Sequence, residues 1–436
     1  MIKNYNKTDL VTINFFVLTF FTHNLLNLNF LKINIDIFLW SFFLMYFIFF
    51  IKWDKKITKK FIYLILSILL FQIFIKIINE LSLFGLIKQI IPIIIIYTST
   101  YFILTKYKFN KIFDVYEKLI ILICVIGLIQ IFLNIFDIQY FQKELWRMNS
   151  IIKEPSHLGM LILPILIKNI IEYKKLNIKL LILVISISFT FSLTVIIAFI
   201  FSIFIFCLWK FINIKQSFSF KLLIPFLMTL ILFGFFSAYA ALNHNSGTLG
   251  LFLKTNTQHF TINHNTINQL SGFYDILYNL VFNPEMYHVN QLSLHSIIST
   301  LRIIIFSLIQ NPFGTGLGGN EEIFHRFNEI FVNFNFKPYD EVNVYKRYYF
   351  SDTTGHSLFL RMILEFGLIF ILIVIVILYK LLQKLKTCSK EQIIIIIPVL
   401  SFLICKTIKL GSYIDYGTNF FIVTLIIILF KKNELN

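Results

Sequence analysis

Charged residues are scarce in this chain of 436 residues: Asp, Glu, Lys and Arg make up 14% of it, against about 25% in soluble globular proteins. Together with 58% hydrophobic residues and a mean hydropathy of +0.79, this scarcity excludes a soluble enzyme, a disordered chain and a fibrous protein. The apolar runs are continuous and do not alternate with polar residues, which excludes an outer-membrane β-barrel. The composition therefore predicts an all-α, polytopic membrane protein.

Cysteines and acidic clusters are also rare. Of the four cysteines, Cys124, Cys207 and Cys405 lie in apolar runs and Cys388 lies in a basic loop; none has CxxC spacing. Neither a zinc site nor a disulfide framework is indicated. No Asp-x-Asp type of cluster occurs, so we expect no metal and no other cofactor. The polar start of the chain leads into an apolar run without a small-residue cleavage site, and we expect a first helix there rather than a cleaved signal.

Positive charge exceeds negative charge, with 39 Lys and Arg residues against 22 Asp and Glu residues and a net charge of +17. In a soluble protein this balance would suggest a nucleic-acid partner. Here the basic residues gather in short clusters between apolar runs, as the positive-inside rule requires. We interpret the charge as a signal of topology and of contact with anionic lipid, and we expect no nucleic-acid partner.

Twelve apolar windows are long enough to cross about 30 Å of hydrocarbon. They lie at about 10–30, 35–51, 61–78, 83–104, 115–136, 157–172, 177–192, 193–211, 221–242, 357–379, 392–409 and 415–430, with the turn between the seventh and eighth near Ser192. Basic clusters follow the even-numbered windows or take the matching position late in the chain, at 52–60, 106–111, 168–179, 210–221, 380–390 and 431–432. A topology of twelve spans, with both termini in the cytoplasm, places every basic cluster on the cytoplasmic side.

This alternation divides the chain into helices 1–9 over 1–242, a large extracytoplasmic (periplasmic) loop over 243–356, and helices 10–12 over 357–436. A short apolar segment within the loop, near 297–310, is interrupted by Arg302, and we interpret it as an interfacial or re-entrant helix. If it spans the membrane instead, the orientation on one side of it inverts. The loop's aromatic residues indicate a folded cap containing short helices, and seven of the nine histidines lie in its neighbourhood.

The first candidate for chemistry lies before the sixth window. Arg147 is followed by Glu154, Pro155 and Ser156. Pro155 suits the first turn of a helix, where its missing N–H is not needed. The amino end of that helix would face the outer surface and attract anions, and Arg147 would add a phosphate-binding cation. The simpler interpretation, and the better one for this motif alone, is an ion pair between Arg147 and Glu154.

The second candidate is Arg302 with the glycine-rich run that follows it. An arginine within an apolar segment is costly and therefore a functional candidate. Gly314, Gly316 and Gly318 permit positive φ and could form a nest of N–H groups for an anion. This glycine-rich run is not a Walker loop, since no Gly-Lys-Ser/Thr follows it. Taken alone, a flexible turn after a helix is the better interpretation.

The third candidate is His356-Ser357, directly before the tenth window, which contains Arg361 and Glu365. His356 could act as a general base near neutral pH, oriented by Glu365 or by Asp352. Arg361 and Glu365 are four residues apart on one helical face, so they could simply pair with each other.

All three candidates lie on the same predicted side at similar depth. Two arginines, a helix amino end and a histidine suit a lipid-linked phosphate or pyrophosphate, with the arginines stabilising the leaving group and the histidine accepting a proton.

At these residues the chain resembles the superfamily of O-antigen polymerases and O-antigen ligases. The resemblance covers roughly residues 115–380 and rests on four short motifs in order. These are Arg147 with Glu154-Pro155-Ser156 and Gly159; Ser192-Leu193-Thr194; Arg302 with Asn311-Pro312-Phe313-Gly314-Thr315-Gly316-Leu317-Gly318; and His356-Ser357 with Glu365-Phe366-Gly367-Leu368.

The resemblance implies a GT-C-like fold and metal-independent glycosyl transfer at the periplasmic face of the bacterial inner membrane, for the synthesis of O-antigen (a lipopolysaccharide part), capsule or exopolysaccharide. The donor would be an oligosaccharide on undecaprenyl pyrophosphate, and a chain-length regulator would be a partner. Catalytic roles fall to His356, Arg302, Arg147 and Glu154. Substrate contacts fall to Ser156, Gly314, Gly316, Gly318, Ser357 and Arg361.

The Glu-Pro-Ser element favours a polymerase over a ligase that transfers glycan to lipid A core. The spacing from His356 to Gly367 also occurs in ligases. A polysaccharide flippase remains an alternative of another class. The small number of intramembrane charges and the large outer loop disfavour it.

Overall fold

The structure, a computed structural model, consists of α-helices joined by turns, and no strand occurs among the residues it describes. These residues are 7–21, 55–135, 148, 150, 152, 154–172, 177–190, 192–212, 301, 303–305, 307–319, 323, 357–409, 411–413 and 417–430. The predicted all-α class is thereby confirmed for this part of the chain. Most of the predicted outer loop, 243–356, lies outside the described residues.

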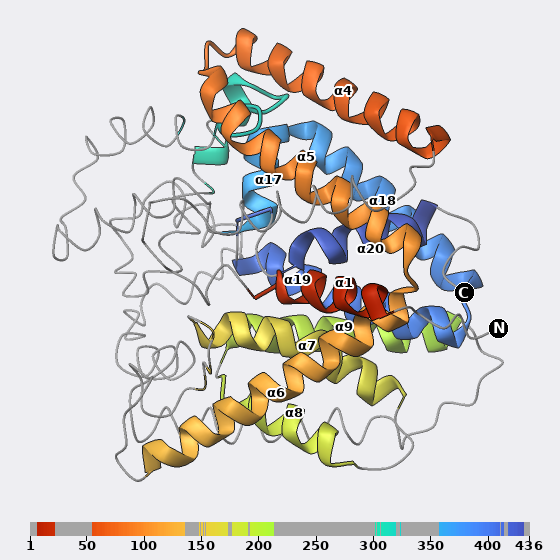
Figure 1. Cartoon of the computed structure of the whole chain (residues 1–436). Helices are drawn as coiled ribbons and strands as arrows, with labels where there is room; N and C mark the ends of the chain where they lie inside the picture. The colour runs from red at the N-terminus through yellow and green to blue at the C-terminus, as the bar shows by residue number, and fades with distance from the viewer. Residues whose placement is uncertain are drawn as a thin grey trace, which may run out of the picture.

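Helices occur at ten of the twelve predicted apolar windows (Figure 1), and the windows at 35–51 and 221–242 lie outside the described residues. They are α1 (Lys7–Leu18), α4 (Lys55–Ile78), α5 (Leu83–Lys106), α6 (Phe109–Ile135), α7 (Pro155–Ile171), α8 (Ile178–Ser188), α9 (Leu193–Ile212), α17 (Leu358–Phe366), α18 (Leu368–Thr387), α19 (Lys390–Lys409) and α20 (Thr418–Phe430). The turn predicted near Ser192 is confirmed, since α8 ends at Ser188 and α9 begins at Leu193.

Helix α7 lies in the middle of the core. Fourteen of its 17 residues are buried, as expected for a helix that is apolar on all sides. It packs against α8, α9 and α19. Aromatic rings close the core beside it, with Phe20, in the turn after α1, in contact with Phe420 of α20 at 5.2 Å between ring centroids, and Phe402 of α19 stacked on Phe421 at 3.9 Å.

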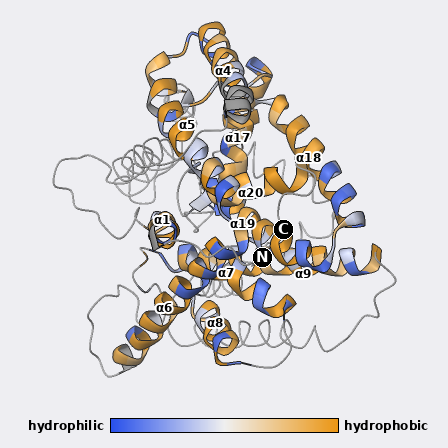
Figure 2. Ribbon diagram, turned by 45° about the vertical axis from the view of Figure 1, so that its right-hand side comes forward, coloured by the Kyte–Doolittle hydropathy of each residue, from blue (hydrophilic) through white to orange (hydrophobic). Residues whose placement is uncertain are grey.

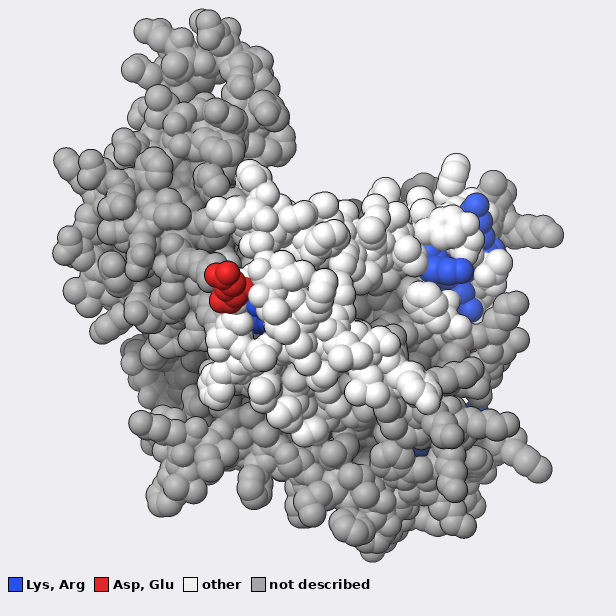
Figure 3. Space-filling model, turned by 90° about the horizontal axis from the view of Figure 1, so that it is seen from above, with Lys and Arg blue, Asp and Glu red and all other residues white. Residues whose placement is uncertain are grey.

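Four helices among the described residues are long and apolar enough to cross a membrane: α5, most of α9 (Thr194–Ile212), α18 and α19. The helices in Figure 2 consist mostly of hydrophobic residues. Large apolar side chains are exposed on α4 and α18, for example Leu70, Phe74, Leu372 and Ile375. On the face seen in Figure 3, charged side chains show at the two sides, mostly acidic on the left and basic on the right, with an uncharged surface between. Such a surface fits a lipid bilayer.

The predicted tenth span, 357–379, is not a single helix. The chain breaks at Gly367, which has φ 59°, and the two parts form α17 and α18, the second of which continues to Thr387. The break is filled by a distant loop, because the Leu368 amide donates to the Pro312 carbonyl at 2.9 Å. A Cβ on Gly367 would lie 2.2 Å from that carbonyl oxygen. Glycine is therefore required for backbone approach as well as for its dihedral angle.

The short segment predicted near 297–310 is helical at its described residues, 301, 303–305 and 307–310. Ile303 and Ile304 are buried against Leu81, in the turn between α4 and α5, and against Leu364 of α17. The segment leads into the loop formed by residues 311–319, which we call the glycine-rich loop. Whether the segment spans the membrane stays a prediction.

Two contacts group α7 with the carboxyl end of α19 at one end and with the first half of α6 near the other, and α7 is about 25 Å long at 1.5 Å per residue. At its amino end, Ser156 accepts a hydrogen bond from Lys409, the last residue of α19. Near its carboxyl end, Lys168 pairs with Glu117 of α6 at 3.0 Å. This grouping agrees with the predicted alternation of helix directions, while the side that faces the cytoplasm stays a prediction.

Candidate functional site

Three of the four predicted catalytic residues, Arg147, Arg302 and His356, lie outside the described residues. The fourth, Glu154, is described, as are all six predicted substrate-binding residues: Ser156, Gly314, Gly316, Gly318, Ser357 and Arg361. Two polar clusters of the described residues contain most of these predicted site residues. We call them the three-helix junction, made of Glu154, Ser156, His157, Ser357, Thr407 and Lys409, and the loop clasp, made of Gln89, Gly318, Arg361, Glu365, Gly411 and Tyr413.

The amino end of α7 begins as the sequence predicts, with Glu154 at the N-cap and Pro155 in the first turn. The Glu154 carboxylate makes no capping hydrogen bond to the helix. Its Oε2 atom instead faces the Lys409 amine at 3.3 Å, the Ser156 hydroxyl at 3.4 Å and the His157 ring nitrogen at 3.6 Å. Glu154 is thus held by cationic and polar side chains, and its own side chain is 47% exposed.

The amino end of α17 meets the carboxyl end of α19 in the same region. Ser357 caps α17 by accepting from the Leu360 amide at 3.3 Å, and its hydroxyl donates to the Thr407 carbonyl of α19. Two residues further along α19, the Lys409 amine reaches Ser156 on α7. The amino ends of α7 and α17 therefore both adjoin the last turn of α19. Each amino end carries a partial positive charge, and Lys409 adds a full one.

The glycine-rich loop is packed rather than flexible. All its amides from Gly314 to Gly319 donate within the protein. The acceptors are the carbonyls of Asn311, Leu364, Glu365 and Gly316, the side-chain oxygen of Gln72 and the carboxylate of Glu365. The side-chain amide of Asn79 also donates to the Gly314 carbonyl at 2.9 Å. The loop therefore joins the α4–α5 hairpin to α17.

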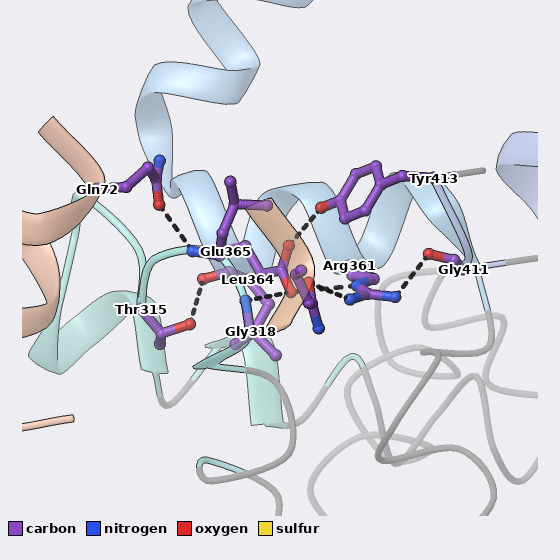
Figure 4. Close-up of polar contacts among 10 residues, drawn as sticks. Gln72, Thr315, Gly318, Arg361, Leu364, Glu365, Gly411 and Tyr413 are labelled. Carbon is purple, nitrogen blue, oxygen red and sulfur yellow. Dashed lines mark hydrogen bonds and ion pairs between the residues drawn. The ribbon is translucent and has the colours of Figure 1, made fainter. Parts of the chain in front are cut away.

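An anion is present at this loop, and it belongs to the chain itself. The Glu365 carboxylate accepts from the Gly318 amide at 3.1 Å, from Arg361 Nε at 3.1 Å and from the Tyr413 hydroxyl (Figure 4). Burial, and then the neighbouring Glu365 carboxylate, raise the pKa of Tyr413 well above its usual value, so its hydroxyl stays protonated and donates. In this arrangement the N–H groups of the loop serve Glu365 and neighbouring carbonyls.

Arg361 takes part in the same cluster and pairs with Glu365, one of the two roles that the sequence left open for it. Only 4% of its surface is exposed. Besides Glu365, its guanidinium donates to the Gly411 carbonyl at 3.0 Å and to Gln89 Oε1 at 2.7 Å, and it lies over the Tyr413 ring at 4.7 Å. A buried charge with several partners and a neutralising carboxylate is the arrangement that low-dielectric surroundings require.

Sequence reasoning did not single out Gln72, Gln89, Lys409 or Tyr413 as site residues. The signal for the two glutamines was available, because each interrupts an apolar run, where a polar side chain is expected to find a specific partner. Lys409 and Tyr413 carried no such signal, since their importance depends on where α19 ends relative to α7 and α17.

Among the described residues, no three His, Cys, Asp or Glu side chains gather in a way that could hold a metal ion. No family model matches this chain, and neither the curated proteins nor the solved structures include a significant match. The similarity of the sequence to O-antigen polymerases and ligases thus rests on the four motifs alone.

Proposed function

We propose that this protein is a metal-independent glycosyltransferase of the O-antigen polymerase type. It would join oligosaccharide repeat units carried on undecaprenyl pyrophosphate, at the extracytoplasmic face of a bacterial inner membrane. The observation that carries the proposal is the three-helix junction. There α7, which begins within the Glu-Pro-Ser element, and α17, which follows His356-Ser357, both contact the last turn of α19.

The proposed chemistry is a single displacement at the anomeric carbon of the donor. The hydroxyl of the acceptor sugar attacks that carbon, His356 takes the hydroxyl proton, and undecaprenyl pyrophosphate leaves with the electron pair of the broken bond. Arg147 and Arg302 would stabilise the charge of the leaving pyrophosphate. Lys409 and the two helix amino ends would add positive potential at the same place.

The surroundings support a lipid-linked substrate. Helices α4 and α18 expose large apolar side chains on the outside of the molecule, so a polyprenyl chain can stay in the bilayer while its head group reaches the junction. Arg361 and Glu365 bond to each other and to neighbouring protein groups. Their charges therefore do not line a cavity for a transported substrate, as a flippase would require. A chain-length regulator protein would act as partner of the polymerase.

The test is the surface glycan of a bacterial strain that lacks this chain, resolved on a gel. The deletion should be complemented with the wild-type gene, with His356→Ala and with Arg302→Ala. For a polymerase, the deletion leaves a single repeat unit on lipid A core and removes the ladder of longer products. Wild type restores the ladder and neither variant does.

The control variant is Lys386→Ala, an exposed basic residue in the last turn of α18 and remote from the motifs. It should restore the ladder fully, at a membrane level equal to that of the other variants. Polymer that accumulates on the lipid carrier without attachment would mean a ligase. Repeat units trapped on the cytoplasmic face would mean a flippase, and an unchanged ladder in the deletion strain would refute the proposal.

A further inference from the structure

The loop clasp joins four segments that are far apart in the sequence. Glu365 lies in α17, Gly318 in the glycine-rich loop, Gln89 in α5, and Gly411 and Tyr413 in the connection between α19 and α20. Arg361 and Glu365 contact all of these segments directly. The same connection follows Lys409, and α17 follows Ser357, so both polar clusters share their supporting chain segments.

Glu365 is the member of the clasp with the most donors. Both of its carboxylate oxygens accept hydrogen bonds, Oε1 from Gly318 and Arg361 and Oε2 from Tyr413. Its side chain is fully buried (0% exposed), so water does not substitute for a lost donor. Its backbone carbonyl also accepts from the Gly316 amide at 2.9 Å. One residue therefore binds the loop through side chain and backbone at once.

The glycines fit this close contact. Gly314 has φ 85°, and a Cβ there would lie 2.6 Å from the Glu365 carbonyl oxygen. Gly318 has φ 74°, and a Cβ there would lie 2.3 Å from the Gly85 carbonyl oxygen. The loop therefore lies directly against the backbone of α17 on one side and of α5 on the other. Because no side chain lies between them at these points, a movement of α17 shifts the loop directly.

We propose that Glu365 is a positioning residue, whose buried carboxylate accepts from the Gly318 N–H, whose backbone carbonyl accepts from the Gly316 N–H, and which thereby fixes the glycine-rich loop to α17. This inference rests on the proposed function. Arg302 precedes the loop by nine residues at Asn311 and His356 immediately precedes Ser357, so the clasp sets the relation between the two chain segments that carry them. Glu365 touches no substrate in this role and acts through those segments.

The experiment uses the full chain in lipid nanodiscs and the variant Glu365→Gln, which keeps the size of the side chain and one acceptor oxygen but removes the charge. Two quantities are measured. Hydrogen–deuterium exchange is followed for the amides of 312–319 and 357–367. Polymer formation is followed with undecaprenyl-pyrophosphate-linked repeat units extracted from a strain that lacks this chain.

We expect exchange in both segments to become at least about tenfold faster in Glu365→Gln, while the amides of α7 keep their protection. We expect kcat to fall about tenfold or more with the donor KM changed less than about threefold, because the groups that bind the donor remain while their alignment is lost. The matched control is Glu391→Gln, an exposed acid in the first turn of α19, which should change neither quantity.

Unchanged exchange in both segments would overturn the proposal, and so would faster exchange with an unchanged kcat, since the clasp would then serve the fold alone. If Glu365→Gln does not fold, Tyr413→Phe decides by the same criteria. That variant removes one donor from the carboxylate and keeps the aromatic ring over Arg361. If the wild-type chain forms no polymer, the proposed function fails, and with it the effect of Glu365 on that reaction; exchange then decides separately whether Glu365 holds the loop.

Discussion

The ammonium group of Lys409, the last residue of α19, donates a hydrogen bond to the hydroxyl of Ser156 in the first turn of α7. The same ammonium group lies 3.3 Å from the Glu154 carboxylate. Both side chains of this ion pair are partly exposed, 29% for Lys409 and 47% for Glu154, so the pair is worth at most about 1 kcal/mol. A pyrophosphate carries more charge than a carboxylate and could displace Glu154 from Lys409 at small cost.

Replacing Lys409 by alanine should therefore weaken the use of the donor more than it weakens the fold. We expect kcat/KM for the lipid-linked donor to fall about tenfold, which corresponds to about 1.4 kcal/mol of transition-state stabilisation. Lys409→Arg keeps the charge and should retain most of the activity. The measurement is polymer formation in nanodiscs over a range of donor concentrations. Lys386→Ala is the charge-matched control, and equal kinetics for Lys409→Ala and wild type would rule out a role for Lys409 in donor binding.

The direction of the helices can be tested at the two ends of α5. Glu80, just before this helix, and Lys108, just after it, are both exposed. Helix α5 has 24 residues, so it is about 36 Å long and exceeds the thickness of the hydrocarbon layer. In spheroplasts, whose inner membrane is intact, a membrane-impermeant maleimide should label Glu80→Cys. It should label Lys108→Cys only after the spheroplasts are lysed.

The unaltered chain provides the background for this labelling, because three of its four cysteines are buried. The reverse pattern, with Lys108→Cys labelled first, would invert the predicted orientation. It would also move the three-helix junction to the cytoplasmic side and remove the basis for an extracytoplasmic reaction.

Two glycines of the glycine-rich loop offer a matched test of its packing. Gly316 and Gly318 both have positive φ, 78° and 74°, so alanine is strained at either position, by about 1–2 kcal/mol. A Cβ at Gly318 would meet the Gly85 backbone at 2.3 Å, whereas a Cβ at Gly316 would meet only side chains, the nearest being Lys76 at 3.1 Å. Gly318→Ala should thus lower the melting temperature clearly more than Gly316→Ala. Equal shifts would mean that the loop does not lie against α5 as described.

Some features of the fold could be predicted from the sequence because they depend on local signals. The start of α7 is one example, since Pro155 suits the first turn of a helix, where its missing N–H is not needed. The start of α8 is another, where Asn177 accepts from the Leu180 amide at 2.8 Å. The pairing of Arg361 with Glu365 followed from their spacing of four residues.

Other features depend on segments that are distant in the sequence. Gly367 lies within a long apolar run, and a single glycine there does not by itself predict a break. The break becomes necessary only because the Pro312 carbonyl approaches from a loop some fifty residues earlier. The glycine-rich loop could be recognised as a set of N–H donors, but no local pattern indicates that its acceptor is Glu365. The contribution of Lys409 likewise depends on three helix ends meeting.

Cys388, between α18 and α19, should be unreactive in the folded protein. The residue is 7% exposed, and burial raises the pKa of its thiol to about 11. Because only the thiolate reacts with a maleimide, roughly one thiol in a thousand is reactive at pH 8.

We expect slow labelling at pH 8, a rate that rises about tenfold per pH unit up to the raised pKa, and fast labelling once the protein is unfolded in detergent. Peptide mapping by mass spectrometry separates Cys388 from the other cysteines. Lys386→Cys, an exposed position two residues earlier in the last turn of α18, gives the rate for an accessible thiol nearby. Similar rates for Cys388 and for this variant would show that the connection between α18 and α19 is open to solvent and that Cys388 is not packed as described.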